Sequence, residues 1–324
     1  MSRSIAVLAA EALQITPDRV VAVARSASTR YRRYALTTGT TGKVRWIHHP
    51  DPELKTIQRW LARCLFSHLP VHDAAFAYRP GRSIADHARV HASRKYILRL
   101  DLRGFFPSIY DDDIQRFFSS PAAMQSLTLA IKGQLPIDDI ALITDLCCRH
   151  GRLTIGAPTS PSLSNAICYQ LDKRLEALMP ADRVCYSRYC DDLYFSCNES
   201  DVLTEMPHRV SAVLGELESP ARLYLNVKKT RHMSRKRRRT VTGLIITPEG
   251  SVSVGRQRRR QVRAAIHNIE KLAKEDRLSL AGTLAYVQNV EPEYLARLYA
   301  QFGAATIDRA RYPTREQRAS NASA

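Results

Sequence analysis

Apolar residues in the first third of the chain follow an extended spacing and then a helical one. Strand-forming runs at 34–36 and 44–47 flank a Gly- and Thr-rich turn at 39–42, which predicts a β-hairpin. After the proline-bounded start at 49–52, apolar residues recur every three or four positions, at Leu54, Ile57, Leu61 and Leu65. This second spacing predicts an amphipathic helix.

The middle of the chain alternates extended and helical runs. Residues 96–100 have the pattern of a largely buried strand that ends at Asp101, and strands are also predicted at 223–227, 240–246 and 251–254. One long helix is predicted from Ser162, with an apolar face of Leu163, Ile167, Leu171, Leu175 and Leu178.

The pattern becomes helical again from Gly255 onward. Apolar residues form one stripe, at Val262, Ile266, Ile269 and Ala273, and a polar stripe beside it holds Arg256, Arg260, Arg263 and His267. The order of helices, strands, helix, strands and helices predicts a mixed α+β protein with a central antiparallel sheet. The polar residues after about 314 are expected to form a frayed tail.

Two adjacent carboxylates, Asp191 and Asp192, lie between strand-forming runs at 184–186 and 193–195. Aspartate is favoured in turns and disfavoured in strands, so a β-hairpin with both acids at its tip is predicted. Such a tip concentrates negative charge, which a divalent cation or cationic side chains neutralise. Taken alone, the pair is more typical of a solvated turn than of a metal site.

The net charge of +18 and the pI near 9.9 indicate a polyanionic partner. Nucleic acid is favoured over a membrane surface, because no long basic amphipathic helix accompanies the charge. The seven cysteines show no zinc-ligand spacing, and their odd number without a secretory signal indicates reduced thiols in the cytoplasm. No apolar stretch approaches the roughly 20 residues that cross a bilayer, so no membrane association is expected.

Asp101 can join the Asp191-Asp192 pair in one site if their strands are neighbours. Sites with two metal ions need several carboxylates that converge from adjacent strands, and such sites support nucleotidyl transfer. Between these acids, the segment 153–165 is rich in Gly, Pro, Ser and Thr and leads into the predicted helix. A loop of this composition can lie against a base pair without side-chain obstruction, although an ordinary helix cap has the same composition.

Together these segments resemble the reverse transcriptases, and among them the bacterial retron-type enzymes. The resemblance covers roughly residues 31–303 and rests on the order and spacing of motifs at 100–109, 156–161, 163–165, 189–192 and 226–230. Two further motifs resemble retron elements, Val-Thr-Gly at 241–243 and the element at 87–91. The chain departs from the family at Thr154 and Ile155, where Pro-Gln is usual, and at His87, where the retron element has Asn.

The resemblance implies a right-hand polymerase fold with fingers, an antiparallel palm sheet and a helical thumb. It divides the chain into N-terminal helices and fingers (1–95), palm (96–114), a fingers or palm insertion (115–150), palm (151–247), thumb (248–313) and tail (314–324). Asp101, Asp191 and Asp192 are the implied catalytic ligands of two Mg²⁺ ions. Phe106 is the implied steric gate against a ribonucleotide 2′-hydroxyl.

Three further residues are expected to contact the incoming nucleotide. Gly156 belongs to the loop that packs the templating pair, and Lys229 is implied to approach the triphosphate and to protonate departing pyrophosphate. The segment 36–38 lacks the family's lysine pair, so Arg45 is the candidate triphosphate contact. Its alternative role is that of an exposed strand arginine.

Basic residues dominate the stretch from Lys228 to Arg263, which contains thirteen Lys or Arg residues and a single acidic residue, Glu249. So dense a run repels itself unless anions screen it, which favours phosphate contact over a solvated turn. A second basic loop at 78–83 is expected near the template path. The predicted nucleic-acid contacts are Arg79, Arg82, Arg235, Lys236, Arg237, Arg238, Arg239, Arg256, Arg260 and Arg263.

The resemblance also implies the partners. They are deoxynucleoside triphosphates, a cognate structured non-coding RNA that serves as template and primer, and the RNA–DNA product. Anti-phage defence with a separate effector protein is implied, as is template removal by a host RNase H, since the chain offers no room for either domain. The alternatives are another bacterial reverse transcriptase (group II intron, diversity-generating or abortive-infection type) and a non-catalytic RNA-binding scaffold with the same fold.

Overall fold

The computed structural model describes residues 4–38, 43–131, 133, 135–178, 180 and 183–313. The chain forms two compact units, each of which is described by itself. Unit 1 comprises residues up to 82 and residues 98–232, and unit 2 comprises residues 83–97 and the residues from 233 onward. Residues 83–97 thus belong with the C-terminal part of the chain, and the finer division into fingers, palm and thumb stays a prediction.

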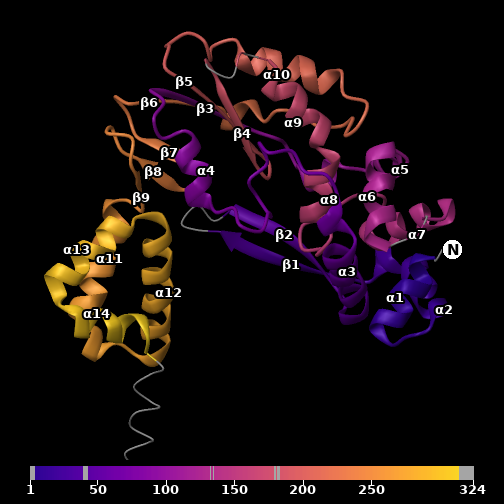
Figure 1. Ribbon diagram of the computed structural model, residues 1–324, viewed down its shortest axis with the longest axis horizontal. Helices are drawn as coiled ribbons and strands as arrows, with labels where there is room; N and C mark the ends of the chain where they lie inside the picture. Colours follow the sequence, from indigo (N-terminus) through magenta and orange to yellow (C-terminus); the bar gives the residue numbers. More distant parts are fainter. Residues whose placement is uncertain are drawn as a thin grey trace, which may run out of the picture. The chain divides into compact units, whose positions relative to one another are not determined.

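Unit 1 has more helices than strands (Figure 1). The α-helices are α1 (Ile5–Leu13), α2 (Pro17–Arg25), α3 (Pro52–Cys64), α5 (Asp111–Phe118), α6 (Pro121–Ile131), α7 (Ile137–Cys147), α8 (Ser160–Ile167), α9 (Tyr169–Glu176) and α10 (Met206–Gly215). Short 3₁₀ helices are η1 (Ala27–Thr29), η3 (Phe66–His68), η4 (Phe106–Ser108) and η5 (Val227–Lys229).

The predicted N-terminal hairpin and helix are confirmed. Strands β1 (Tyr31–Thr38) and β2 (Lys43–Pro50) pair antiparallel, and the tip at 39–42 lies outside the described residues. Helix α3 follows directly, with Pro52 in its first turn and Asp51 as N-cap, whose side chain accepts a hydrogen bond from Leu54 N at 2.8 Å. The predicted apolar residues of this segment are all buried.

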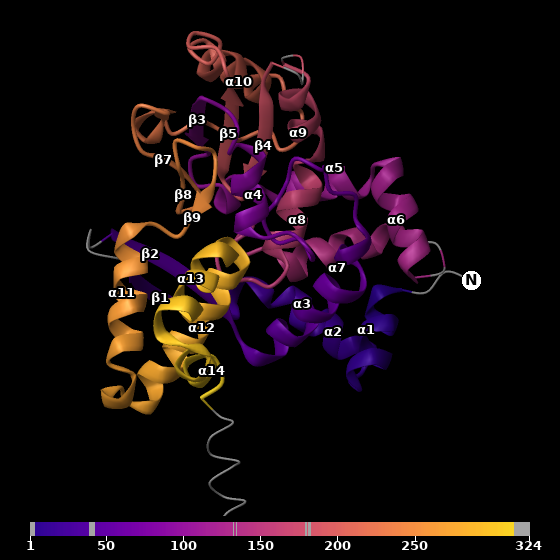
Figure 2. The same ribbon diagram turned by 60° about the vertical axis from the view of Figure 1, so that its left-hand side comes forward.

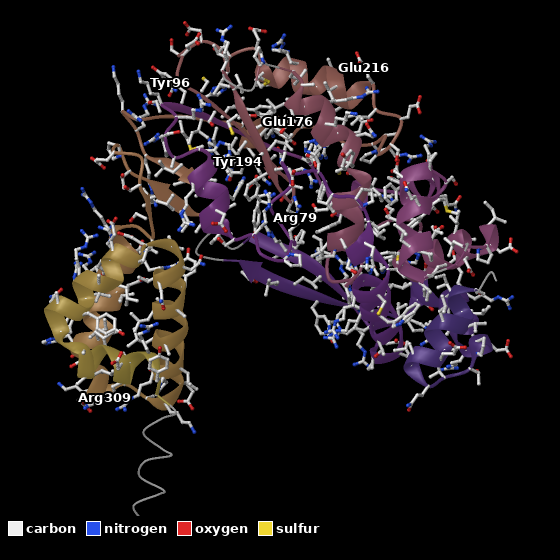
Figure 3. The ribbon with its side chains drawn as sticks, in the orientation of Figure 1. Arg79, Tyr96, Glu176, Tyr194, Glu216 and Arg309 are labelled. Atoms are coloured by element: carbon white, nitrogen blue, oxygen red, sulfur yellow. The ribbon has the colours of Figure 1, made fainter. Side chains whose placement is uncertain are left out.

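A four-stranded sheet carries the acidic turn. Its strand order is β4 (Cys185–Tyr189), β5 (Asp192–Cys197), β3 (Tyr96–Asp101) and β6 (Arg231–Ser234). Strands β4 and β5 pair antiparallel, as predicted, and Tyr194 of β5 is buried within the sheet (labelled in Figure 3). Helices α9 and α10 lie beside β4 and β5 in both ribbon views (Figures 1 and 2). Helices on one side of an antiparallel sheet agree with the α+β class that the sequence predicted.

Unit 2 combines a short helix, a small sheet and a group of helices. It contains α4 (Ile84–Val90), a sheet in the order β7 (Arg239–Val241), β8 (Leu244–Ile246) and β9 (Val252–Ser253), and then α11 (Arg256–His267), η6 (Ile269–Lys271), α12 (Lys274–Val290), α13 (Pro292–Phe302) and α14 (Ala304–Arg311). Helices α11 to α14 pack on one another and bury Val262, Ile266, Leu284, Leu298 and Ile307.

Two sequence predictions in unit 1 are wrong in detail. The helix predicted from Ser162 begins at Ser160 and is interrupted at Cys168, which separates α8 from α9. The segment 223–227 is not a strand, because only Leu225 forms an isolated bridge, with Leu102, before the 3₁₀ helix η5 begins. The apolar residues Tyr224 and Val227, which suggested a strand, are exposed.

Two predictions in unit 2 are also corrected. The segment 240–246 is a hairpin, because Thr242 and Gly243 take φ of 47° and 82° and reverse the chain between β7 and β8. The helix predicted from 255 onward ends at His267, so the predicted apolar stripe does not continue along one helix. Ile269 is buried in η6, and Ala273 is exposed. No helix among the described residues is long and apolar enough to cross a bilayer.

Two histidines, His87 and His91, are completely buried on α4 and its C-cap, with their rings edge to face at 5.6 Å. The pKa of His87 is lowered from 6.5 to about 2 and that of His91 to about 3, mainly by burial, with a smaller contribution from the charge of Arg94 for His91. The folded unit therefore holds both imidazoles neutral, whereas the unfolded chain takes up protons below pH 6.5. Their contribution to stability is complete above pH 6.5 and is lost as the pH falls.

We predict that unit 2 loses roughly 1 kcal/mol of unfolding free energy per buried histidine for each pH unit below 6.5. Urea unfolding at pH 7.5 and 5.5, followed by hydrogen exchange of α4, measures this loss. The variant His87→Gln/His91→Gln should show a smaller loss than the wild type, and His267→Gln on the exposed face of α11 should match the wild type. An equal loss in wild type and double variant would contradict the prediction.

Candidate active site

The acidic turn is a two-residue connection between β4 and β5. Tyr189 pairs with Asp192, so Cys190 and Asp191 form the turn and Asp192 is the first residue of β5. Cys190 takes a left-handed φ of 57°, which is uncommon for a residue other than glycine. The prediction of a hairpin is thus confirmed, with one acid in the turn and the second at the start of the strand.

Backbone hydrogen bonds bring three separate segments to this turn. The amide of Leu102 donates to the Asp191 carbonyl oxygen at 2.8 Å, and the amide of Asn226 donates to the Asp101 carbonyl oxygen at 2.7 Å. The end of β3, the turn and the segment before η5 are therefore fixed side by side. Asp101 is thus joined to segments that lie 90 and 125 residues further along the sequence, and its predicted proximity to the Asp191-Asp192 pair is confirmed for the backbone.

Asp101 is the most buried of the three acids, with only 4% of its surface exposed. Its Oδ2 accepts a hydrogen bond from Lys229 Nζ at 2.5 Å. Its Oδ1 is buried and has no hydrogen-bond partner among the described residues. A buried carboxylate oxygen without a partner carries a substantial desolvation cost, so this oxygen is suited to a cationic ligand.

Asp192 lies in an environment that disfavours its charge. The pKa of its carboxyl group is raised to about 6, mainly by burial and also by the nearby charges of Asp191 and Asp101, although Arg99 and Lys229 act in the opposite direction. Arg99 Nε lies 3.8 Å from Asp192 Oδ1. Sequence reasoning missed Arg99, although a charged residue two positions before Asp101 in an apolar strand was a usable signal.

The charge of the site fits divalent cations. Three carboxylates repel one another, and hard cations such as Mg²⁺ take oxygen ligands of this kind. Within the described ranges, however, no group of three or more His, Cys, Asp or Glu side chains is arranged to hold a metal ion. Lys229 and Arg99 supply the neutralising charge in the arrangement seen here.

Phe106, the predicted gate, begins the 3₁₀ helix η4 five residues after Asp101 and is half-buried. Its ring lies 6.4 Å from the ring of Tyr78, measured between centroids, and 5.4 Å from that of Phe105. Tyr78 in turn donates a hydrogen bond from its hydroxyl to Cys190 Sγ at 3.2 Å. The sequence placed Tyr78 in a basic loop and gave no sign that its ring reaches the acidic turn.

Gly156 makes a close approach to protein backbone. Its φ is +110°, and a Cβ at this position would lie 2.5 Å from the His48 carbonyl oxygen and 2.9 Å from Ile47 Cγ2. The loop is tied to β2 there, because His48 N donates to the Ile155 carbonyl oxygen at 2.8 Å. The structure therefore accounts for this glycine by packing against β2, whereas its predicted contact with the templating pair stays a prediction.

Arg45 is exposed on β2, directly opposite Leu36 of β1. Alternate residues of a strand share one face, so Arg45 lies on the same face of the ribbon as Ile47. Ile47 is the residue that contacts the Gly156 loop. Arg45 thus lies on the side of the ribbon that faces this loop, which is compatible with the predicted triphosphate contact.

A buried polar network supports the turn from behind. Arg188 and Asp172 are both completely buried and form a bidentate ion pair, with Nε–Oδ1 and Nη2–Oδ2 distances of 2.8 and 2.7 Å. Tyr186 donates its hydroxyl to Asp172 Oδ1 at 2.7 Å. Arg188 Nη1 donates to Asn165 Oδ1 at 3.1 Å and to the Cys190 carbonyl oxygen at 3.3 Å. The arginine thereby links α8, α9 and the acidic turn.

The predicted basic cluster divides into exposed and buried members. Residues 235–238 are exposed in the turn before β7 and line a groove of about 1070 Å³ in unit 2, together with Arg256, Arg258 and Arg259. Arg239 is 1% exposed, and its guanidinium group donates to the carbonyl oxygens of Arg94 and Thr247. A guanidinium group held in this way cannot reach a phosphate, so Arg239 is structural.

The remaining predicted contacts also differ in exposure. Arg256, Arg260 and Arg263 are exposed on α11 and line a second hollow of about 570 Å³. Arg79 and Arg82 are half-buried, and both bind Asp73, at 3.4 and 3.0 Å (Arg79 is labelled in Figure 3). Some of the hydrogen-bond donors of these two arginines therefore bind Asp73 of their own loop and stabilise it.

Comparison with known proteins places this geometry in a family. The family model described as reverse transcriptase (RNA-dependent DNA polymerase) matches residues 36–246. The retron Ec83 reverse transcriptase of Escherichia coli is 32% identical over 90% of this chain and 93% of its own length. The retron Ec86 reverse transcriptase of the same organism is 27% identical over 93% of this chain and 91% of its own length.

Among solved structures, apo telomerase from Candida tropicalis is similar with a TM-score of 0.45 and 10% identity, over 69% of this chain and 47% of that one. A likeness at this level adds nothing to the family assignment.

We predict that Asp172→Asn lowers the unfolding free energy by about 3–5 kcal/mol, because it leaves the buried Arg188 charge without its partner. The matched control is Glu199→Gln, which removes the exposed ion pair between Glu199 and Arg183 and should cost no more than about 1 kcal/mol. Urea unfolding of both variants at neutral pH measures the difference. A cost for Asp172→Asn as small as that of the control would show that the buried pair does not stabilise the fold.

Proposed function

The chain belongs to the reverse transcriptase family and is an RNA-directed DNA polymerase of the retron type, and from this premise we propose its substrate, product and mechanism. It copies part of a cognate structured non-coding RNA into RNA-linked single-stranded DNA. Synthesis starts from the 2′-hydroxyl of an internal guanosine of that RNA and proceeds by nucleotidyl transfer supported by two Mg²⁺ ions. The biological role of the product is anti-phage defence.

The convergence of three aspartates carries this proposal. Asp101 from β3 and the Asp191-Asp192 turn between β4 and β5 meet at one edge of the sheet, where backbone hydrogen bonds fix their segments. Asp101 Oδ1, which has no partner among the residues described, and the raised pKa of Asp192 support a role as metal ligands, because a nearby cation stabilises both carboxylates. Reverse transcriptases use divalent metal ions, and these three residues would hold them here.

The metal ions, when bound, activate the attacking hydroxyl and neutralise charge on the triphosphate. The side chains of the chain itself supply the remaining functions. Lys229, held 2.5 Å from Asp101 Oδ2, carries a proton that it can donate to departing pyrophosphate. Phe106 excludes a ribose 2′-hydroxyl, and Arg45 binds the triphosphate from the β1–β2 ribbon.

The exposed cations of unit 2 bind the RNA and the growing heteroduplex. Phosphate groups can bind in the groove beside residues 235–238 and along the stripe of Arg256, Arg260 and Arg263. The two hollows share lining residues, so these contacts are adjacent within that unit. Contacts of this kind orient nucleic acid without reading its sequence. Recognition of the cognate RNA therefore depends on its folded shape as well as on charge.

The retron Ec83 and Ec86 reverse transcriptases match this chain over about nine-tenths of their own length, and this similarity supports the proposal of a retron product. On this proposal a separate effector protein uses the RNA-linked DNA, and a host RNase H removes the copied template. Intact Asp101, Asp191 and Asp192 favour a catalytic protein over an RNA-binding scaffold.

We predict that Asp191→Ala/Asp192→Ala lowers DNA synthesis by on the order of 1000-fold or more, because two of the three metal ligands are lost. The assay follows extension after purification with the co-expressed RNA, in the presence of labelled deoxynucleotides and Mg²⁺. The matched control is Glu199→Ala/Asp201→Ala, which removes the same charge from exposed positions of unit 1. Equal products from the wild type and the Asp191/Asp192 variant would refute the polymerase proposal.

We predict that Lys236→Gln/Arg237→Gln/Arg238→Gln weakens RNA binding and reduces the slope of log K against log salt by about 2–3, because three phosphate contacts are lost. Binding is measured between 50 and 300 mM salt, on the order of the range where counterion release dominates. The control is Arg25→Gln/Arg59→Gln/Arg63→Gln, which changes the charge equally at exposed positions of α2 and α3. The same slope in both variants would show that residues 236–238 form only a solvated turn.

A further inference from the structure

Tyr78 combines two unusual properties. Its φ is +60°, a left-handed conformation that bulky residues rarely adopt. The residue is 49% exposed, although tyrosine is large and partly apolar. The same loop places a glycine, Gly81, at a φ of +75°, where no side chain has to be accommodated. Strain of this kind persists where the side chain itself is needed, and it is frequent at functional sites.

The segment before Tyr78 is rigidly attached to the sheet. Ala75 bridges Arg188 in parallel, with Arg188 N donating to the Ala74 carbonyl oxygen at 2.7 Å and Phe76 N donating to the Arg188 carbonyl oxygen at 2.8 Å. Asn165 Nδ2 donates to the Ala77 carbonyl oxygen at 2.7 Å. These bonds end one residue before Tyr78, so the backbone that leads to its ring is fixed to β4 and α8.

The ring of Tyr78 connects the two parts of the candidate site that the mechanism uses separately. Its hydroxyl donates to Cys190 Sγ at 3.2 Å, within the acidic turn. Its ring lies beside Phe106, with 6.4 Å between centroids and 40° between planes, a tilted arrangement that is attractive for aromatic pairs. Tyr78 therefore contacts the residue between Tyr189 and Asp191 and supports the proposed gate from the side.

We propose that Tyr78 is a positioning residue that sets selectivity for the sugar of the incoming nucleotide. It holds the Phe106 ring in the place where that ring excludes a ribose 2′-hydroxyl, and the Cys190 contact fixes the tyrosine relative to the acidic turn. The inference rests on the proposed function of Phe106. The loop does not need the Tyr78 ring to hold it in place, because the side chains of Asn165, Arg79 and Arg82 already bind backbone carbonyl oxygens of residues 73–77.

The test compares Tyr78→Gly, Tyr78→Phe, Phe106→Val and Tyr78→Gly/Phe106→Val. Glycine removes the ring and suits a φ of +60°, so Tyr78→Gly should not lower the melting temperature. Single-nucleotide incorporation by each RNA-bound variant gives kcat/KM for a deoxynucleotide and for the matching ribonucleotide. Tyr312→Ala, at an exposed tyrosine of unit 2, is the control and should leave both values unchanged.

The expected result is a loss of deoxynucleotide selectivity of about 2- to 12-fold for Tyr78→Gly, which corresponds to one aromatic pair. Tyr78→Phe keeps the ring and should retain most of the selectivity. The double variant should be no less selective than Phe106→Val alone, because Tyr78 acts through Phe106.

Three outcomes would overturn the proposal, and they differ in whether they also refute the gate role of Phe106. If Phe106→Val lowers selectivity and Tyr78→Gly does not, Tyr78 has no positioning role and the gate stands. If Phe106→Val leaves selectivity unchanged, the gate fails and the support that Tyr78 gives it fails as well. If Tyr78→Gly lowers the melting temperature and both kcat/KM values in equal proportion, the residue is structural only. An inactive wild-type complex would instead refute the polymerase proposal itself.

Discussion

The buried ion pair between Arg188 and Asp172 positions most of the candidate site. Two charges without solvent exposure are costly unless every donor and acceptor is satisfied, and here both carboxylate oxygens accept hydrogen bonds. The remaining Arg188 donor reaches Asn165 and the Cys190 carbonyl oxygen. The backbone of the same arginine binds the segment before Tyr78. The side chain of Arg188 thus fixes α8, α9 and the acidic turn, and its backbone fixes the loop that presents Tyr78.

This buried support allows the acids in front of it to remain poorly neutralised. One oxygen of Asp101 has no partner in the described part of the chain, and the pKa of Asp192 is raised by burial and by its acidic neighbours. Such an arrangement is unfavourable by itself, and a rigid frame is needed to prevent the carboxylates from moving apart. Lys229 and Arg99 reduce the repulsion only in part. The site is therefore held ready for cationic ligands by the fold behind it.

The sequence predicted the features that depend on local patterns. The ribbon, α3 and the acidic hairpin followed from spacing and turn residues, and the three aspartates followed from motif order. Features that depend on tertiary contacts were missed. Nothing local shows that Arg239 turns inward while residues 235–238 stay exposed, or that 223–227 lacks strand partners. Tyr78 and Arg99 gain their importance only from neighbours that are distant in the sequence.

The departures from the family at Thr154 and Ile155 also acquire a physical meaning. Thr154 Oγ1 lies 2.9 Å from His48 Nδ1, and its amide donates to Ser160 Oγ at 3.3 Å, a bond that proline cannot make. The Ile155 carbonyl oxygen accepts from His48 N. Both residues thus couple the start of α8 to β2, the strand that carries Arg45. These contacts position the ribbon through the backbone of Ile155 and the side chain of Thr154, whereas the side chain of Ile155 itself is exposed.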